Sequence, residues 1–233
     1  MRGKLAAALA ACAAVAVLVT VARSESGDPA LARARARLAQ VSGQLRRLED
    51  ERQIEDLQRT YGYFVDKALW KQTAELFAPD GTLEIGGRGV FVGQKRILDY
   101  LTFLAPQGLT RGLLFNHIQL QPVITVAPDG RTAKGRWHFV SEVGEYQKSA
   151  LWGMGSYENE YVKQNGVWKI RALHAYFRMY TPYEKGWAEA AQPNTHPEAA
   201  LPPDRPPTVL YRIYPGTYIP PYHFPNPVTG AAH

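Results

Sequence analysis

The chain has 233 residues and a mass of 26.0 kDa, and 45% of its residues are hydrophobic, 11% aromatic and 21% charged. This composition is that of a globular protein and excludes a disordered or fibrous one. The net charge of +6 is too small an excess to indicate binding to nucleic acid.

The first residues have the pattern of a secretory signal. An uncharged apolar run over 5–21 follows Arg2 and Lys4, and small residues near its end suit a signal peptidase. We therefore predict a signal peptide over 1–22 and a periplasmic or secreted protein. Two alternatives place the protein at a membrane: an uncleaved anchor, or lipidation of Cys12, which ends a sequence similar to a lipoprotein box.

Residues 23–49 are predicted to form a helical lead-in to the domain. Asp28-Pro29 is a typical helix start, with an N-cap acceptor followed by proline at the first helical position. Leu31, Leu38 and Leu45 recur every seven residues and give a narrow apolar stripe, which is typical of a helix that packs on a partner helix. The stripe indicates a homo-oligomer, and a helical stalk between a membrane and the domain is the alternative.

Residues 50–187 have the pattern of one α+β domain. Helices are predicted over 54–69, 71–77 and 94–104. Two short strands, 82–85 and 90–92, are predicted between the second and third of these helices. The turn sequence Pro79-Asp80-Gly81 is expected to end the second helix. Four β-branched and aromatic runs follow at 116–126, 132–143, 149–163 and 167–180, the last two joined by Asn165-Gly166, a hairpin signal. This order predicts helices that cover one face of a curved antiparallel sheet.

Residues 188–233 form a segment rich in proline and tyrosine. Of the 17 prolines, 12 lie between Pro182 and Pro227, which excludes a central strand or a long helix. The segment also contains too many aromatic residues for a free linker, among them Tyr211, Tyr214, Tyr218, Tyr222 and Phe224. We expect an extended arm laid over the domain or over a neighbouring subunit.

A set of motifs runs through the domain in a fixed order. It consists of Tyr61 and Asp66, Trp70, Leu76-Phe77, Asp80-Gly81, Gly93, His117, Trp152-Gly-x-Gly-x-Tyr157 and Tyr161-Val-Lys-x-x-Gly166-x-Trp168-Lys-Ile170. In this order the residues resemble the SnoaL-like branch of the nuclear transport factor two-like superfamily. The resemblance implies a cone-shaped fold, with a curved sheet and helices around one apolar pocket. Members include scytalone dehydratase, ketosteroid isomerase, polyketide cyclases, limonene epoxide hydrolase and non-catalytic binding domains, so the fold does not decide the function.

Asp66, His117 and Tyr61 are the catalytic candidates. Asp66 lies among apolar residues of a predicted helix, so its carboxylate would be partly desolvated if it faced a pocket, which suits a general base. Pairing with a neighbouring surface lysine is the alternative. His117 can donate or accept a proton near neutral pH. The resemblance implies pocket positions for Asp66 and His117 and an oxyanion-donor role for Tyr61, although a buried tyrosine also serves as plain core.

Tyr63, Trp137, Tyr157, Arg171 and His174 are the candidates for substrate binding. Tyr63 is three residues before Asp66 and so shares its helix face. Trp137 and Tyr157 lie on strand faces, and the glycines at 153 and 155 suggest a floor kept open for a flat ligand, with a bulge or a close helix contact as the alternative. Alternation puts Arg171 and His174 on opposite faces of the last strand, so one of them is expected to point inward.

These residues lead to three hypotheses. The first is a cofactor-independent lyase for a small apolar aromatic molecule, by dehydration or by release of formaldehyde from a lignin-derived compound. Asp66 and His117 would exchange protons with the substrate, and Tyr61 or Tyr63 would hold an oxygen. The second is a non-catalytic ligand-binding or assembly domain, and the third is a polyketide cyclase or isomerase. Ile85 stands where ketosteroid isomerase-like members keep their base, which disfavours steroid chemistry.

No metal or cofactor is expected from the sequence. There is no His-x-His or Glu-x-x-His cluster and no glycine-rich phosphate loop. Cys12 is the only cysteine, so cleavage of the signal would leave no thiol nucleophile and no zinc-thiolate site.

Overall fold

The structure is a computed structural model that describes residues 28–232. This part of the chain divides into two compact units, residues 28–48 and the chain from Glu49 onward. The predicted signal peptide over 1–22, with Cys12, lies outside the described residues. Among residues 28–232, no helix has both the length and the apolar character needed to cross a membrane.

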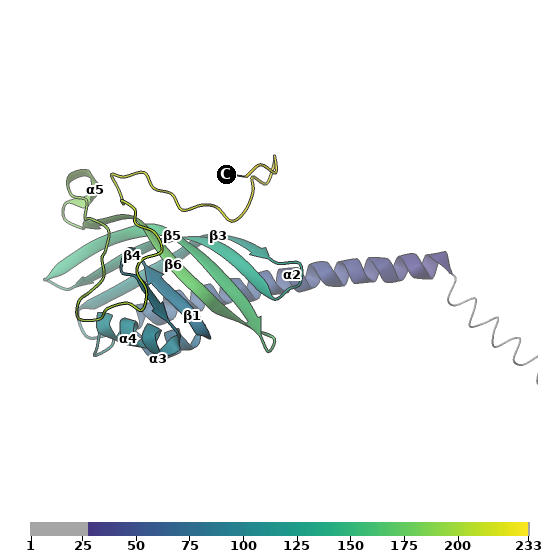
Figure 1. Cartoon of the computed structure of the whole chain (residues 1–233), viewed down its shortest axis with the longest axis horizontal. Coiled ribbons are helices and arrows are strands. Elements are labelled where there is room, and N and C mark those ends of the chain that lie inside the picture. The colour runs from purple at the N-terminus through teal and green to yellow at the C-terminus, as the bar shows by residue number, and fades with distance from the viewer. Residues whose placement is uncertain (1–27, 233) are drawn as a thin grey trace, which may run out of the picture. The chain divides into compact units, whose positions relative to one another are not determined.

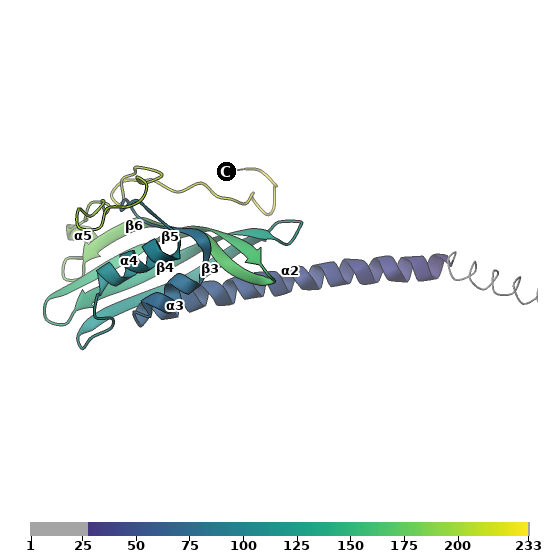
Figure 2. The ribbon, with the colours of Figure 1, turned by 60° about the horizontal axis from the view of Figure 1, so that its bottom comes forward.

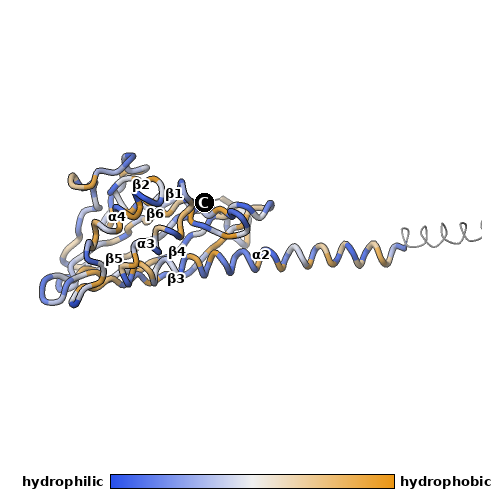
Figure 3. The backbone as a smooth tube through the Cα atoms, turned by 90° about the horizontal axis from the view of Figure 1, so that it is seen from below, coloured by the Kyte–Doolittle hydropathy of each residue, from blue (hydrophilic) through white to orange (hydrophobic). Residues whose placement is uncertain are grey.

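The first unit is the N-terminal part of helix α2, which runs over Pro29–Asp66. Asp28 caps the helix as expected, because its Oδ1 accepts a hydrogen bond from the Ala30 N–H at 2.8 Å. Apolar residues recur along the helix (Figure 3). Leu38 and Leu45 of the predicted stripe are exposed and Leu31 is half-buried, and the nearby Val41 and Leu48, which extend the stripe, are also exposed.

The second unit is built on a six-stranded sheet in the order β2-β1-β6-β5-β4-β3 (Figure 1). The strands are β1 Phe77–Ile85, β2 Val90–Val92, β3 Leu113–Val126, β4 Thr132–Glu145, β5 Ser149–Gln164 and β6 Val167–Pro182. All neighbours are antiparallel except β1 and β6, which are parallel. The α+β class is confirmed, but the sheet is mixed and not purely antiparallel. A tight hairpin forces antiparallel pairing, and β1 and β6 are too far apart in sequence to be joined by one.

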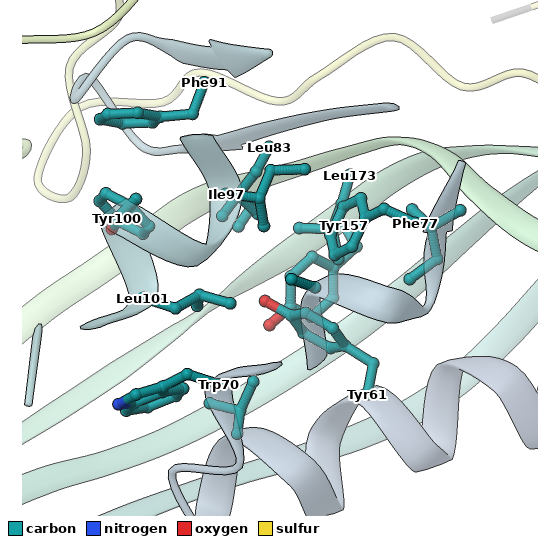
Figure 4. Packing of buried hydrophobic residues seen from close by; sticks show 14 of the residues in the cluster. Tyr61, Trp70, Phe77, Leu83, Phe91, Ile97, Tyr100, Leu101, Tyr157 and Leu173 are labelled. Atoms are coloured by element: carbon teal, nitrogen blue, oxygen red, sulfur yellow. The ribbon is translucent and has the colours of Figure 1, made fainter. Parts of the chain in front are cut away.

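Helices α3 (Trp70–Glu75), α4 (Gln94–Leu104) and the C-terminal part of α2 cover one face of the sheet (Figure 2). The hydrophobic core lies between these helices and the inner face of the sheet, and it includes Tyr61, Phe77, Ile97, Tyr157 and Leu173 (Figure 4).

One predicted boundary is wrong. Pro79-Asp80-Gly81 does not separate helix from strand, because β1 begins at Phe77 and runs through this sequence. The register with β6 shifts between Phe77 and Thr82, so the turn-like residues form an irregularity inside the strand.

The C-terminal arm, residues 190–232, follows the short helix α5 (Gly186–Glu189) and passes the β2 edge of the sheet, where Asp204 pairs with Arg96 of α4. Its later part lies on the face of the sheet opposite α3 and α4 (Figure 2). The arm bonds to β2 through Asp204 and Arg205, whose N–H groups donate to the Val90 carbonyl at 3.0 and 3.2 Å. Farther along, the Tyr211 and Tyr218 rings stack at 4.7 Å between centroids and contact Tyr176 of β6. The arm therefore covers the outer face of this chain's own sheet.

Candidate active-site cavity

A cavity of about 190 Å³ lies between the helices and the inner face of the sheet. Its lining is mostly aromatic and aliphatic, and its polar members are Tyr61, Arg88, Tyr100, His117, Ser141, Tyr157 and Tyr180. An apolar cavity of about 150 Å³ is enough to hold benzene. The space therefore suits one aromatic ring with a short substituent.

His117 lines this cavity, and Asp66 contacts His117 from a neighbouring pocket that His117 also lines. The Asp66 Oδ1 accepts a hydrogen bond from the His117 backbone N–H at 2.7 Å and lies 3.4 Å from the His117 Nδ1. The side chains are only 18% and 19% exposed. A carboxylate at Nδ1 fixes the orientation of the imidazole and leaves Nε2 as the nitrogen available to a ligand.

The local sequence explains why these two residues are adjacent. Asp66 is the last residue of α2, and the chain turns away at Ala68, which has a φ of +50°. Gly62, one turn earlier, lets α2 approach β3 closely, since a Cβ there would lie 3.1 Å from the His117 carbonyl oxygen and 3.0 Å from the Gln119 Cγ. The helix end is thereby held against the strand that carries the histidine.

Tyr61 and Tyr157 bring hydroxyl groups to the same cavity. Their rings pack edge to face, 6.3 Å between centroids, and their hydroxyl oxygens lie close together (Figure 4). Burial raises the pKa of the Tyr61 hydroxyl well above its usual value, and the nearby phenols of Tyr157 and Tyr100 raise it further. Burial likewise raises the pKa of Tyr157. Both groups are neutral at physiological pH and can donate hydrogen bonds to a ligand oxygen.

Tyr63 and Trp137, two of the predicted binding residues, lie outside the cavity. Tyr63 is 72% exposed, because the buried face of the helix passes through Tyr61 and Val65 and position 63 falls on the opposite side. Trp137 is buried on the inner face of β4, where its Nε1 donates to the Tyr161 hydroxyl at 3.0 Å. Trp137 is therefore a core residue, and of the five candidates for binding only Tyr157 lines the cavity.

The expectation that Arg171 or His174 points inward is wrong because of a bulge. Tyr161 pairs with Ile170 but Glu160 pairs with Ala172, so Arg171 is an extra residue that breaks the alternation. Arg171 is exposed, with its Nε 3.9 Å from a Glu160 oxygen. After the bulge Ala175 faces the cavity, and His174 lies on the other face of the sheet.

The interpretation of the glycines on β5 as an open floor is also wrong. A Cβ at Gly155 would lie 2.8 Å from the Phe139 Cζ, and one at Gly153 would lie 2.4 Å from the Ser141 Oγ. Both glycines allow close packing of β4 side chains, beside a register shift between Met154 and Gly155. The alternative of a bulge describes this site, but the close contacts of the glycines are with strands β4 and β6 and not with a helix.

Arg88, Tyr100 and Tyr180 line the cavity but were missed by the sequence reasoning. Arg88 is the one charged residue in the sequence Gly86-Gly87-Arg88-Gly89, between two predicted strands. A single cation framed by glycines is the signal that could have identified it. Among residues 28–232, no cluster of three or more His, Cys, Asp or Glu side chains is arranged to hold a metal ion.

Comparison with known protein families and solved structures supports this architecture. The SnoaL-like domain family matches residues 46–174. Similar solved structures include LinA, with a TM-score of 0.53 and 22% identity over 60% of this chain and 93% of that chain. The hexachlorocyclohexane dehydrochlorinase LinA-type3 from Novosphingobium barchaimii LL02 gives the same four values. A candidate scytalone dehydratase from Novosphingobium aromaticivorans DSM 12444 has a TM-score of 0.52 and 21% identity over 66% of this chain and 96% of that chain.

At these identities the solved structures show the fold alone. A search of curated proteins found no match. The family match covers more than half of the chain and includes Tyr61, Asp66, His117 and Tyr157. The chain therefore belongs to the SnoaL-like domain family.

Proposed function

We propose that the protein is a cofactor-independent lyase that eliminates a small group from a one-ring aromatic substrate, with the Asp66–His117 pair as its base. The observation that carries the proposal is the imidazole at the wall of an apolar cavity, with a carboxylate oxygen 3.4 Å from its Nδ1. Such a pair keeps Nε2 free to take a proton and stabilises the imidazolium that results.

In the proposed elimination, the His117 Nε2 takes a proton from a substrate carbon next to a carbonyl group. The electron pair of the broken C–H bond becomes the new C=C bond, and the leaving group departs with the electron pair of its own bond to carbon. Tyr61 or Tyr157 donates a hydrogen bond to the carbonyl oxygen, where negative charge develops. In a dehydration the imidazolium returns its proton to the departing hydroxide, so the net loss is water.

Release of formaldehyde from a hydroxymethyl group would use the same residues. The His117 Nε2 takes the hydroxyl proton, and the C–C bond breaks as the C=O bond of formaldehyde forms. The electron pair of the C–C bond stays on the ring-side carbon, and the imidazolium returns its proton to that carbon, so a C–H bond replaces the C–C bond. The cavity volume of about 190 Å³ favours a one-ring compound over a lignin-derived dimer.

The names of two structural relatives support the reaction class but not a substrate. One is called a dehydrochlorinase and another a candidate scytalone dehydratase. Both names describe the loss of a small molecule. The superfamily also contains non-catalytic binding domains, so membership does not by itself indicate an enzyme. The proposal therefore depends on the Asp66–His117 geometry.

The test is a screen of one-ring hydroxylated, chlorinated and hydroxymethylated aromatic compounds, with the product mass as the readout. His117→Ala should lower turnover by about 10²–10⁴-fold, because it removes the base. Asp66→Asn should lower it as well, through the loss of the carboxylate at Nδ1. His138→Asn is the matched control, because His138 is an exposed histidine of β4. Unchanged turnover in His117→Ala would show that the proposed mechanism is wrong.

A further inference from the structure

Arg88 places a positive charge inside the cavity without a carboxylate partner. The side chain is half-buried and lines the cavity. Its Nη1 donates to the Tyr100 hydroxyl at 2.5 Å, and within the described chain this is the hydrogen bond its guanidinium makes. No ion pair of Arg88 is present among residues 28–232, and Glu198 acts on it only from beyond ion-pair distance.

The position of Arg88 is fixed by the conformation of its turn and by the C-terminal arm that packs on it. Gly86 and Gly89 have φ values of +59° and +89°, which favour glycine. The Gly87 N–H donates to the Thr195 Oγ1 of the C-terminal arm at 3.0 Å. A Cβ at Gly87 would lie 2.2 Å from the Thr195 carbonyl oxygen, so the arm packs directly on the turn.

A desolvated guanidinium is costly unless its N–H groups meet an acceptor, preferably a charged one. Arginine has five N–H donors in a planar fork, which matches the two oxygens of a carboxylate. Tyr180 also lines this cavity, and burial raises the pKa of its hydroxyl, so it stays a neutral donor. The wall at Arg88 thus combines a positive charge with O–H donors, as an anion requires.

The turn that carries Arg88 and the strand that carries His117 are at opposite ends of the strand order. Arg88 comes from the turn between β1 and β2, whereas His117 comes from β3, and β2 and β3 are the two opposite edges of the sheet. The cavity spans between them and is lined by both residues. A ligand anchored at Arg88 would therefore direct its other end toward the Asp66–His117 pair.

We infer that Arg88 binds an anionic group of the substrate, and that the cavity accepts an aromatic carboxylate with one ring. As a statement about the substrate, this inference rests on the proposed function. A carboxylate fits better than a phosphate, because a single guanidinium balances one negative charge and the space holds little beyond the ring.

The experiment measures binding, so it does not depend on turnover. The purified full chain is titrated by calorimetry with benzoate, phenylacetate and cinnamate, and with the amide of each acid as the uncharged counterpart. We expect at least one carboxylate to bind about tenfold or more tightly than its amide, as a charge-assisted hydrogen bond predicts. Arg88→Gln should abolish this preference and leave the affinity for the amide unchanged. Arg88→Lys keeps the charge without the fork and should retain only part of the preference.

Arg171→Gln is the control for the loss of one positive charge, because Arg171 is exposed and outside the cavity. It should keep the full preference for the carboxylate. The inference is overturned if the wild type binds no carboxylate more tightly than its amide, including the case of no binding at all. It is also overturned if Arg88→Gln keeps the preference. If Arg88→Gln does not fold by circular dichroism, Arg88→Lys decides: a reduced preference for the carboxylate supports the inference, and a full preference overturns it.

The two proposals fail separately. If His117→Ala keeps the preference for the carboxylate and turns over substrate as fast as the wild type, the lyase mechanism is wrong and the anion site stands. If turnover depends on His117 but no carboxylate is preferred, the lyase mechanism stands and the anion site is wrong.

Discussion

Tyr161 shows how single polar groups hold the site in place. Its hydroxyl donates to the Gln58 Oε1 at 3.0 Å and accepts hydrogen bonds from the Trp137 Nε1 at 3.0 Å and the Asn159 Nδ2 at 3.1 Å. Gln58 in turn donates to the Gln119 side chain at 2.9 Å, and Gln119 donates to the His117 carbonyl at 3.1 Å. A buried network therefore leads from the core to the backbone of the proposed base.

Tyr161→Phe tests this network. The change leaves the Trp137 Nε1 and part of Asn159 without a partner, so the free energy of unfolding should fall by about 2–4 kcal/mol. The measurement is urea unfolding, and Tyr63→Phe is the control. Tyr63 is 72% exposed, and its replacement should change stability by less than about 0.5 kcal/mol. Equal losses in the two variants would contradict a special role for the buried hydroxyl.

His174 predicts a dependence of stability on pH. Burial lowers its pKa to about 4, although a Glu84 carboxylate oxygen lies 3.5 Å from its Nδ1. Burial also raises the pKa of Glu84, opposed by two hydrogen bonds from Thr208. The lowered pKa means that the unfolded chain binds a proton at His174 before the folded chain does. Stability must therefore fall as the pH drops from about 6.5 toward 4.

Because of this histidine, the free energy of unfolding should be lower at pH 5 than at pH 7.5 by on the order of 2 kcal/mol. His174→Asn cannot be protonated in this range, so it should lose correspondingly less stability over the same interval. Urea unfolding at the two pH values gives the comparison, with His138→Asn as the control at an exposed histidine. An unchanged pH profile in His174→Asn would show that the proton binds elsewhere.

At the scale of elements, the C-terminal arm is held to the sheet by a buried carboxylate. The Glu84 side chain of β1 accepts a hydrogen bond from the Thr208 N–H at 2.8 Å and one from the Thr208 hydroxyl at 2.9 Å. The arm thus depends on this anchor as well as on its aromatic packing against Tyr176. Through the turn beneath Thr195, the same arm supports Arg88.

Thr208→Val tests the anchor with nearly the same shape. The loss of the hydroxyl bond to a buried carboxylate should lower the free energy of unfolding by about 1–3 kcal/mol. Limited proteolysis should also cleave the arm faster than in the wild type, because the arm is released first. Thr132→Val, at an exposed position of β4, is the control and should resist cleavage like the wild type. Unchanged cleavage of the arm in Thr208→Val would show that the aromatic contacts suffice.

At the scale of the whole molecule, the stripe on the first part of α2 predicts self-association. Leu38, Leu45 and Leu48 are 67%, 55% and 63% exposed, on a unit that is a single helix in the described chain. Most of the stability of a helix in a protein comes from packing of its apolar face, so a partner helix that covers the stripe would stabilise this part of α2. We propose that a second copy of this chain provides that helix.

Replacing Leu38 and Leu45 together with glutamate should abolish the association, because it puts charges on the stripe. Sedimentation of the purified chain gives the mass, and the wild type is expected to be larger than the double variant. Gln40→Glu with Gln44→Glu, at exposed positions of the same helix, adds the same two negative charges and leaves the leucines intact. A wild type that sediments as a monomer at micromolar concentration would contradict the prediction.

Local patterns in the sequence were enough for the class of the fold and for part of the site. Helical and strand periodicities are properties of neighbouring residues, so the order of helices followed by long strands could be predicted. The motif order pointed to Asp66, His117, Tyr61 and Tyr157. The last three line one cavity, and Asp66 is hydrogen-bonded to His117. Each of these residues lies inside a regular helix or strand, where the local pattern is informative.

The remaining features depend on strand register or on contacts between distant parts of the chain. The parallel pairing of β1 with β6 joins strands far apart in sequence. The bulge at Arg171 lies within the hairpin of β5 and β6, where one extra residue breaks the alternation and turns His174 to the outer face. Arg88 enters the cavity from a turn whose position depends on the arm more than a hundred residues later. Register and long-range packing leave no periodic signal in the residues concerned, and so these parts of the site became visible only once the chain was folded.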